Sequence, residues 1–311
     1  MEQNTIAIIW DFDKTLIDGY MQEPIFKKYG VESNIFWKEV NKLPELYQEQ
    51  GIRVNKDTVY LNHMITCAQQ GIFPNLTNKL LFQLGAELKF YPGVSKIFHD
   101  LKDSIANNQD YQKYAIHVEH YIVSTGLTQM IKGCAISKFV DGIWGCEFIE
   151  SPIQSKLGKS ELKQVDIIQQ PGYIIDNTSK TRAIFEINKG VNMYSYIDVN
   201  SKMAPKDRRV PFDNMIYIAD GPSDVPVFSI LKQYGGKTFA IYPKGDLSAM
   251  EQVDSLRRDG RIDMFAEADY TKDSTAYMWL MSHADKIARK IYEEREDEVK
   301  KTVGNPPKHL V

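Results

Sequence analysis

IAIIWDFDKTL, at residues 6–16, places five apolar residues directly before two aspartates, Asp11 and Asp13. An unbroken apolar run of this length is typical of a β-strand that is buried on both faces, as in a parallel sheet covered by helices. Carboxylates at the mouth of a buried strand are costly unless a metal ion or a partner charge compensates them. The stretch therefore predicts a central strand that ends in a cation-dependent site.

Three later apolar runs end in the same abrupt way, at residues 121–125, 215–219 and 238–242. Segments with apolar residues three and four positions apart lie between the runs, which predicts helices. These segments are residues 80–88, 94–101, 127–138, 179–189 and 225–233. The alternation predicts an α/β fold with a doubly wound parallel sheet, whose ligands bind beyond the carboxyl ends of the strands.

Residues 19–90 differ from the rest, because they contain several helical patterns and no convincing buried strand. We interpret them as a smaller helical cap domain, inserted into a core domain of residues 1–18 and 91–311. The sequence YPGV at residues 91–94 marks the return to the core, since Pro followed by Gly makes a turn that admits a following helix.

Polar residues dominate three segments that we expect to be surface loops, residues 103–112, 154–172 and 200–214. The last segment contains four basic residues, and we favour a solvated loop over an anion-binding lip. These basic residues are Lys202, Lys206, Arg208 and Arg209. Residues 273–301 predict a long helix with a charged second half, whose charges we interpret as a solvated face and, as the minority alternative, as a dimer contact.

A second acidic cluster, ADGPSDVP at residues 219–226, follows the strand-like run MIYIA. It places Asp220 and Asp224 at the end of another parallel strand. Oxygen ligands with room for water suit Mg²⁺. The sequence HVEH contains His117 and His120 at the entry to a strand, and we interpret this pair as structural because no further ligands accompany it.

A phosphate bound beside these carboxylates requires positive charge and hydrogen-bond donors. Ser124 offers a hydroxyl at the end of YIVSTG, and Thr125 is the alternative donor. The backbone amides of Thr125 and Gly126, if they open the next helix, would form an anion-binding nest. Lys180, at the start of a predicted helix, is the best candidate for the neutralising cation, ahead of Lys189 and Lys159.

The order of these motifs resembles the haloacid dehalogenase (HAD) superfamily, in its phosphatase branch with a helical cap of the C1 type. DFDKT matches the first motif, IVSTG the second, Lys180 the third and DGPSD the fourth, over residues 6–228. The phosphoserine-phosphatase-like members are the most similar, because their second motif also carries Ser before small residues. The resemblance implies a Rossmann-like core.

The resemblance also implies a role for each matched residue. Asp11 would be the nucleophile and Asp13 the general acid and base, while Mg²⁺ would be held by a set comprising Asp11, Asp13, Asp220 and Asp224. Of these, Asp220 would be a direct ligand, and Asp224 would bind the ion or orient its water. Lys180, with Ser124, Thr125 and Gly126, would bind the substrate phosphate.

These motifs predict a Mg²⁺-dependent phosphatase that hydrolyses a small phosphorylated metabolite through an aspartyl-phosphate. A phosphotransferase or phosphomutase on the same core is an alternative. A receiver-like Mg²⁺-binding module without turnover is another, although Asp13 argues against it, since a stable acyl-phosphate is better preserved without an adjacent base.

Composition and charge narrow the expected partners and location. The 311-residue chain has a net charge of -3, which gives no global attraction to nucleic acid or to an anionic membrane. Three scattered cysteines predict reduced thiols, and the amino terminus has no signal-like segment, which together favour the cytoplasm. We expect a small phosphorylated substrate and a monomer or homodimer.

Overall fold

The computed structural model describes residues 2–157 and 166–303. Seven strands form one sheet in the order β4-β3-β2-β1-β5-β6-β7. All neighbours are parallel except β3 and β4. The strands are β1 (Thr5–Trp10), β2 (His117–Leu127), β3 (Gly142–Ile149), β4 (Gln170–Tyr173), β5 (Met215–Ala219), β6 (Lys237–Tyr242) and β7 (Met264–Glu267). The predicted α/β fold with a mainly parallel sheet is confirmed.

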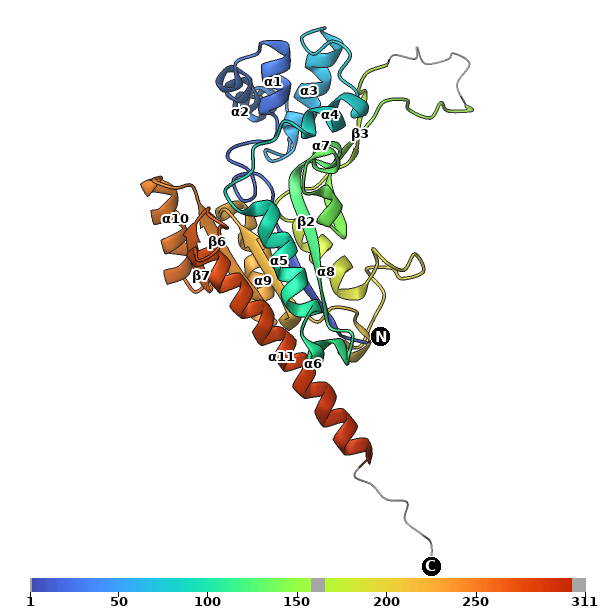
Figure 1. Cartoon of the computed structure of the whole chain (residues 1–311). Helices are drawn as coiled ribbons and strands as arrows, with labels where there is room; N and C mark the ends of the chain where they lie inside the picture. Colours follow the sequence, from blue (N-terminus) through green and yellow to red (C-terminus); the bar gives the residue numbers. More distant parts are fainter. Residues whose placement is uncertain (1, 158–165, 304–311) are drawn as a thin grey trace, which may run out of the picture.

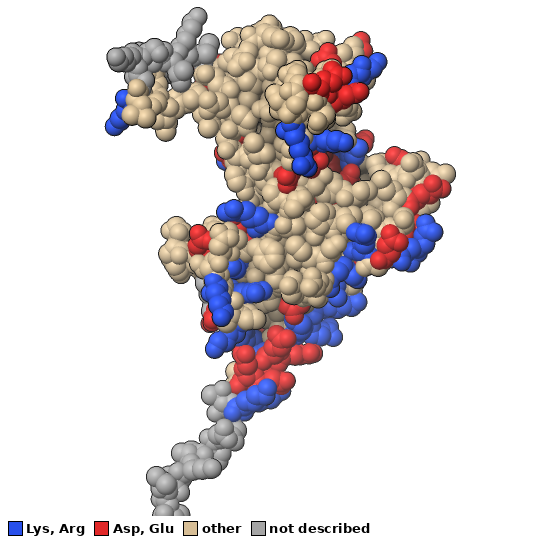
Figure 2. Space-filling view, turned by 180° about the vertical axis from the view of Figure 1, so that it is seen from behind, with Lys and Arg blue, Asp and Glu red and all other residues tan. Residues whose placement is uncertain are grey.

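Helices cover both faces of this sheet (Figure 1). On one face α5 packs against α11, and on the other α8 packs against α9. The helices outside residues 19–90 are α5 (Val94–Ala106), α6 (Gln109–Gln112), α7 (Thr128–Gly133), α8 (Lys180–Lys189), α9 (Val225–Gln233), α10 (Leu247–Arg258) and α11 (Thr275–Val303). The second half of α11 extends beyond the body, where Figure 2 shows side chains of both charges.

The central strand β1 is buried along its whole length. Its last residue, Trp10, stacks on Phe98 of α5 with the ring centroids 4.9 Å apart, and the edge of Tyr270 packs on it at 5.8 Å. The Trp10 indole also donates to His120 Nδ1 at 3.2 Å, and the other nitrogen of His120 bonds to the Phe98 carbonyl at 2.9 Å. His120 is thus fixed inside the core, which agrees with its structural interpretation.

Four helices lie between β1 and α5 and form the upper part of the molecule in Figure 1. They are α1 (Glu23–Tyr29), α2 (Ser33–Glu49), α3 (Val59–Gln69) and α4 (Asn78–Gly85). Helix α4 approaches α7 very closely: a Cβ at Gly133 would come within 1.8 Å of the Phe82 carbonyl oxygen. The boundaries of the cap, residues 19–90, stay a prediction.

The loop prediction for residues 103–112 is wrong. Helix α5 continues to Ala106, and α6 follows after two residues. The side chain of Asn108 accepts from the amide of Asp110 at 2.9 Å and so caps α6, while Ile105 and Tyr111 are buried. Asn and Gln residues made the segment look like a turn, but Asn is also a preferred N-cap residue.

The interpretation of residues 200–214 as a solvated loop is wrong for Arg209. This side chain is buried, and its Nη1 donates to Glu119 Oε2 at 2.8 Å and to the Tyr121 hydroxyl at 3.1 Å. Within the loop predicted over residues 154–172, residues 158–165 lie outside the described residues, and the prediction is wrong at its end, because β4 begins at Gln170. No helix in the described part of the chain is both long and apolar enough to cross a bilayer.

Candidate active site

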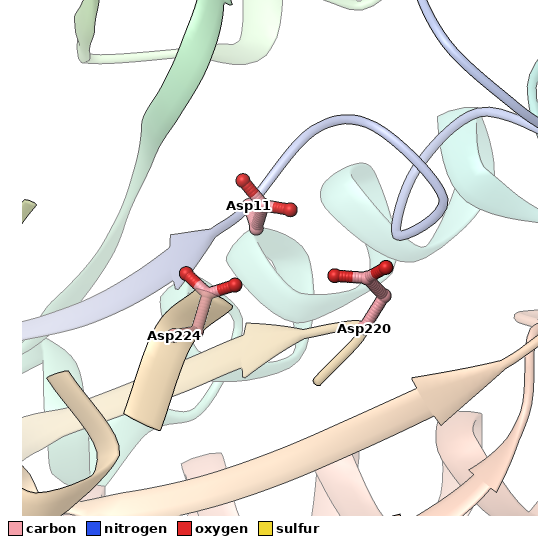
Figure 3. Close-up of side chains that lie close together, drawn as sticks. All are labelled: Asp11, Asp220 and Asp224. Carbon is pink, nitrogen blue, oxygen red and sulfur yellow. The ribbon is translucent and has the colours of Figure 1, made fainter. Parts of the chain in front are cut away.

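Three carboxylates meet at the carboxyl ends of β1 and β5 (Figure 3). Asp11 follows β1, Asp220 follows β5, and Asp224 ends the short 3₁₀ turn Pro222–Asp224 before α9. The strands are neighbours, and the Asp11 amide still donates to the Ile218 carbonyl at 2.8 Å. One oxygen of each carboxylate lies within 4.8 Å of the others. Strand pairing therefore fixes the spacing of these acids.

Lys180 is the cation at the centre of this group. It is the first residue of α8, is 1% exposed, and its Nζ donates to Asp11 Oδ1 and to Asp224 Oδ1, both at 2.7 Å. Burial lowers the pKa of Lys180, but the two carboxylates outweigh burial and raise that pKa above its ordinary value. Lys180 therefore remains an ammonium.

The cluster contains more acidic than basic groups. With Asp11, Asp220 and Asp224 all ionised around a bound cation, three negative charges would face the one ammonium of Lys180. Burial raises the pKa of Asp11 well above its usual range, and burial followed by the charge of Asp224 raises that of Asp220. A set of only oxygen ligands with this charge excess fits a hard divalent cation.

Asp13 lies beside the cluster, but its carboxylate is not part of the three-residue group. Its Oδ1 accepts from the Met21 amide at 3.0 Å. Burial raises the pKa of Asp13 to about 7, although the Met21 hydrogen bond acts in the opposite direction. The expected four-residue ligand set thus contains three grouped carboxylates and one carboxylate that is held by the backbone.

The expected nest at Thr125 and Gly126 is wrong in its local structure. Both residues belong to β2, where the pairing with β3 shifts between Val123 and Leu127, and α7 begins only at Thr128. The Gly126 amide donates to Ser124 Oγ at 2.9 Å. An irregular strand end, rather than a helix start, therefore holds the buried Ser124 hydroxyl.

Two tyrosines, to which the sequence assigns no individual role in the site, contact the site residues. The hydroxyl of Tyr217, within β5, donates to Asp224 Oδ1. The hydroxyl of Tyr60, from α3, donates to the Thr125 carbonyl at 2.7 Å. The contact of Tyr217 could have been inferred from the sequence, because a buried phenol within an aliphatic strand needs a hydrogen-bond partner. The contact of Tyr60 could not, because its position depends on how α3 packs.

The parallel sheet, with this cluster at the ends of β1 and β5, has a fold similar to that of a HAD family hydrolase of known structure. A HAD family hydrolase, t0658 from Salmonella enterica serovar Typhi, has a TM-score of 0.51 and 13% identity, over 89% of this chain and 70% of that chain. A phosphoserine phosphatase determined as a phospho-aspartyl intermediate analogue has a TM-score of 0.46 and 14% identity, over 83% of this chain and 91% of that chain.

A comparison of sequences gives the family itself. An uncharacterized protein of Borreliella burgdorferi is 39% identical over 285 residues, which are 90% of this chain and 96% of that protein. The chain belongs to the same family as this protein. No protein-family model matches the chain.

Proposed function

We propose that the protein is a Mg²⁺-dependent phosphatase that hydrolyses a small phosphorylated metabolite through an aspartyl-phosphate on Asp11. The buried contact of the Lys180 ammonium with both Asp11 and Asp224, at 2.7 Å each, carries the proposal. A carboxylate in direct contact with a permanent cation supports the proposal, because phosphoryl transfer through an aspartyl-phosphate requires both groups.

Asp11, Asp220 and Asp224 are the residues that would hold Mg²⁺. The ion would supply neutralising charge for the phosphoryl oxygens. Lys180 stabilises the same oxygens, because its ammonium lies between two of the three carboxylates. The hydroxyl of Tyr217 and that of Ser223, at 2.7 Å, donate to Asp224 and hold it in place.

Chemistry begins at the carboxylate of Asp11. Lys180 bonds to Oδ1, so we assign Oδ2 as the atom that attacks phosphorus. A new O–P bond forms to Asp11 as the P–O bond to the alcohol breaks, and Asp13 gives its proton to the leaving alkoxide. Asp13 then takes a proton from water, which attacks the same phosphorus, so that inorganic phosphate leaves and the Asp11 carboxylate is restored.

The Met21 amide orients Asp13 for both proton transfers by its 3.0 Å bond to Oδ1. The Tyr60 hydroxyl ties α3 to the strand end that carries Ser124. These contacts connect the helical segment to the reacting groups. We therefore propose that residues 19–90 act as the cap that excludes water from the leaving group.

Phosphate release from a panel of phosphorylated metabolites, with and without Mg²⁺, tests the proposal. Asp11→Asn should lower kcat by at least ~10³-fold, because an amide cannot form the acyl-phosphate, and EDTA should abolish turnover in the wild type. Asp254→Asn makes the same change on α10, where Asp254 pairs with Arg257, and should keep turnover. Equal rates for Asp11→Asn and the wild type would refute the assignment.

Product analysis separates hydrolysis from transfer. A phosphatase releases one inorganic phosphate for each ester consumed, whereas a phosphomutase returns the phosphate to a second position and releases little. Measuring both products in one assay therefore decides between the two reactions.

A further inference from the structure

Lys14 has an unusual backbone conformation for a lysine. Its φ is 55°, in the left-handed region that favours glycine, and its amide donates to the Gly19 carbonyl at 3.0 Å. Strained positions of this kind cluster at functional sites, where the surrounding structure maintains them. The local fold therefore holds a long cationic side chain directly after Asp13.

Lys14 lies on the less buried side of the cluster. Asp11, Asp224 and Lys180 are buried, whereas Asp13, Lys14 and Asp220 are only partly buried. The carboxylates of Asp220 and Asp13 both attract the Lys14 ammonium. Among residues 2–157 and 166–303, however, no carboxylate pairs with Lys14 within 4.0 Å. The ammonium of Lys14 is therefore not neutralised by a direct ion pair, although the Tyr20 side chain also interacts with it.

Aromatic residues hold the ammonium and extend from it. Lys14 Nζ lies 4.4 Å from the centroid of the Tyr20 ring, a cation–π contact. The Tyr20 ring is 5.4 Å from that of Trp37 in α2, which is 5.9 Å from that of Tyr60. Tyr60 in turn bonds to Thr125. Tyr20, Trp37 and Tyr60 thus form a row of aromatic rings that runs from Lys14, across the helical segment, to the end of β2.

Trp37 contributes a second, independent observation. Its indole nitrogen is buried and has no hydrogen-bond partner in the part of the chain that the structure describes. Buried donors are nearly always paired in folded proteins. A polar ligand held between the helical segment and the core would supply the missing acceptor.

We propose that Lys14 binds a second anionic group, on the alcohol part of the substrate, so that the protein selects phosphate monoesters bearing a carboxylate or a further phosphate. This inference rests on the proposed phosphatase function. With the reacting phosphate at Asp11 and Lys180, the alcohol extends toward the less buried side. There the Lys14 ammonium attracts an anion, and the Tyr20 ring fixes its position.

Three esters of similar size test the selection: propyl phosphate, the phosphate ester of 3-hydroxypropanoate, and propane-1,3-diyl bisphosphate. For the wild type, kcat/KM should be at least ~10-fold higher for the two esters with a second anionic group. Comparing the carboxylate ester with the bisphosphate shows which anion is preferred. The decisive quantity is the kcat/KM of each of these two esters divided by the kcat/KM of propyl phosphate.

Lys14→Gly removes the ammonium and should bring this ratio close to one. The melting temperature of the Lys14→Gly variant should not fall below that of the wild type, since glycine suits a φ of 55°. Lys14→Arg keeps the charge and should keep the preference. Lys28→Ala, an exposed lysine of α1, should leave the ratio unchanged. The proposed role of Lys14 would be refuted if the wild type hydrolysed all three esters equally well, or if the preference remained in Lys14→Gly. Either result would leave the proposed phosphatase function intact. Turnover of no monoester would overturn both.

Discussion

Two groups of buried charges lie on the same sheet and differ in their balance. At the carboxyl end of β1, three aspartates share one lysine. Near the start of β2, the neighbouring strand, Glu119 pairs with Arg209, and Tyr121 bonds to both side chains. In the second group one carboxylate faces one guanidinium, and Tyr121 and His117 also bond to that carboxylate. In the first group three carboxylates face one ammonium, so the charges do not balance when all of these groups are ionised.

This difference separates a binding site from a structural ion pair. Burying charges costs free energy unless they are paired and hydrogen-bonded, so a balanced pair can stabilise the folded protein by itself. An unbalanced cluster is neutralised by a bound cation or, without one, by proton uptake at its carboxylates. The aspartate cluster should therefore respond to added cations, and the Glu119–Arg209 pair should not.

Lys180→Met gives the largest expected effect on stability. It removes the one cation among buried carboxylates, and breaking a buried ion pair from one side costs about 3–5 kcal/mol. Urea unfolding at pH 7 in EDTA should show a loss of this size. Arg182→Met is the matched control on α8, because the Arg182–Glu186 pair has an exposed arginine, and its urea midpoint should stay that of the wild type. An unchanged midpoint for Lys180→Met would contradict the assigned role of Lys180.

Mg²⁺ should stabilise the wild type by less than Lys180→Met destabilises it. Binding to the folded state alone contributes about 2.7 kcal/mol when the free ion is at 100 times its dissociation constant. Asp220→Asn removes one ligand and one unmatched charge, so it should raise the melting temperature in EDTA and reduce the increase caused by Mg²⁺. In Glu119→Gln, Mg²⁺ should raise the melting temperature by as much as in the wild type. A Mg²⁺ response that is equal in Asp220→Asn and the wild type would place the ion elsewhere.

Much of the fold was predictable because buried strands have a simple signal. The apolar runs before Asp11 and Asp220 predict parallel strands, and the carboxyl ends of parallel strands meet at one edge. The start of α8 likewise predicted the position of Lys180. For these residues, sequence position and strand order suffice to bring the side chains together.

The remaining features depend on contacts between distant segments. Arg209 is in a polar loop by composition, and only the fold reveals that Glu119 lies opposite it. The left-handed conformation of Lys14 has no signal in its residue type. Gly126 suggests a helix start, but the structure uses it in an irregular strand end, where a Cβ would come within 2.2 Å of the Met21 methyl group.

Glu119→Gln should also destabilise the folded protein, and this effect should depend on pH. Burial alone would raise the pKa of Glu119, but hydrogen bonds from His117, Arg209 and Tyr121 lower it to about 2, from an ordinary 4.5. A lowered carboxyl pKa stabilises the folded state above the ordinary value, and this contribution disappears as the pH falls from about 4.5 to about 2. A fall of the pKa from 4.5 to about 2 corresponds to about 3 kcal/mol at pH 7.

Urea unfolding of Glu119→Gln and the wild type at pH 7 and at pH 3 measures this dependence. The difference in unfolding free energy should be largest at pH 7 and should shrink at pH 3. Glu147→Gln, on β3, is the control, because Glu147 lies 3.8 Å from Lys132 at the surface and should change stability little at either pH. A difference that stays constant with pH would mean that Glu119 contributes through packing and not through its charge, and the balanced pair would then lose its electrostatic explanation.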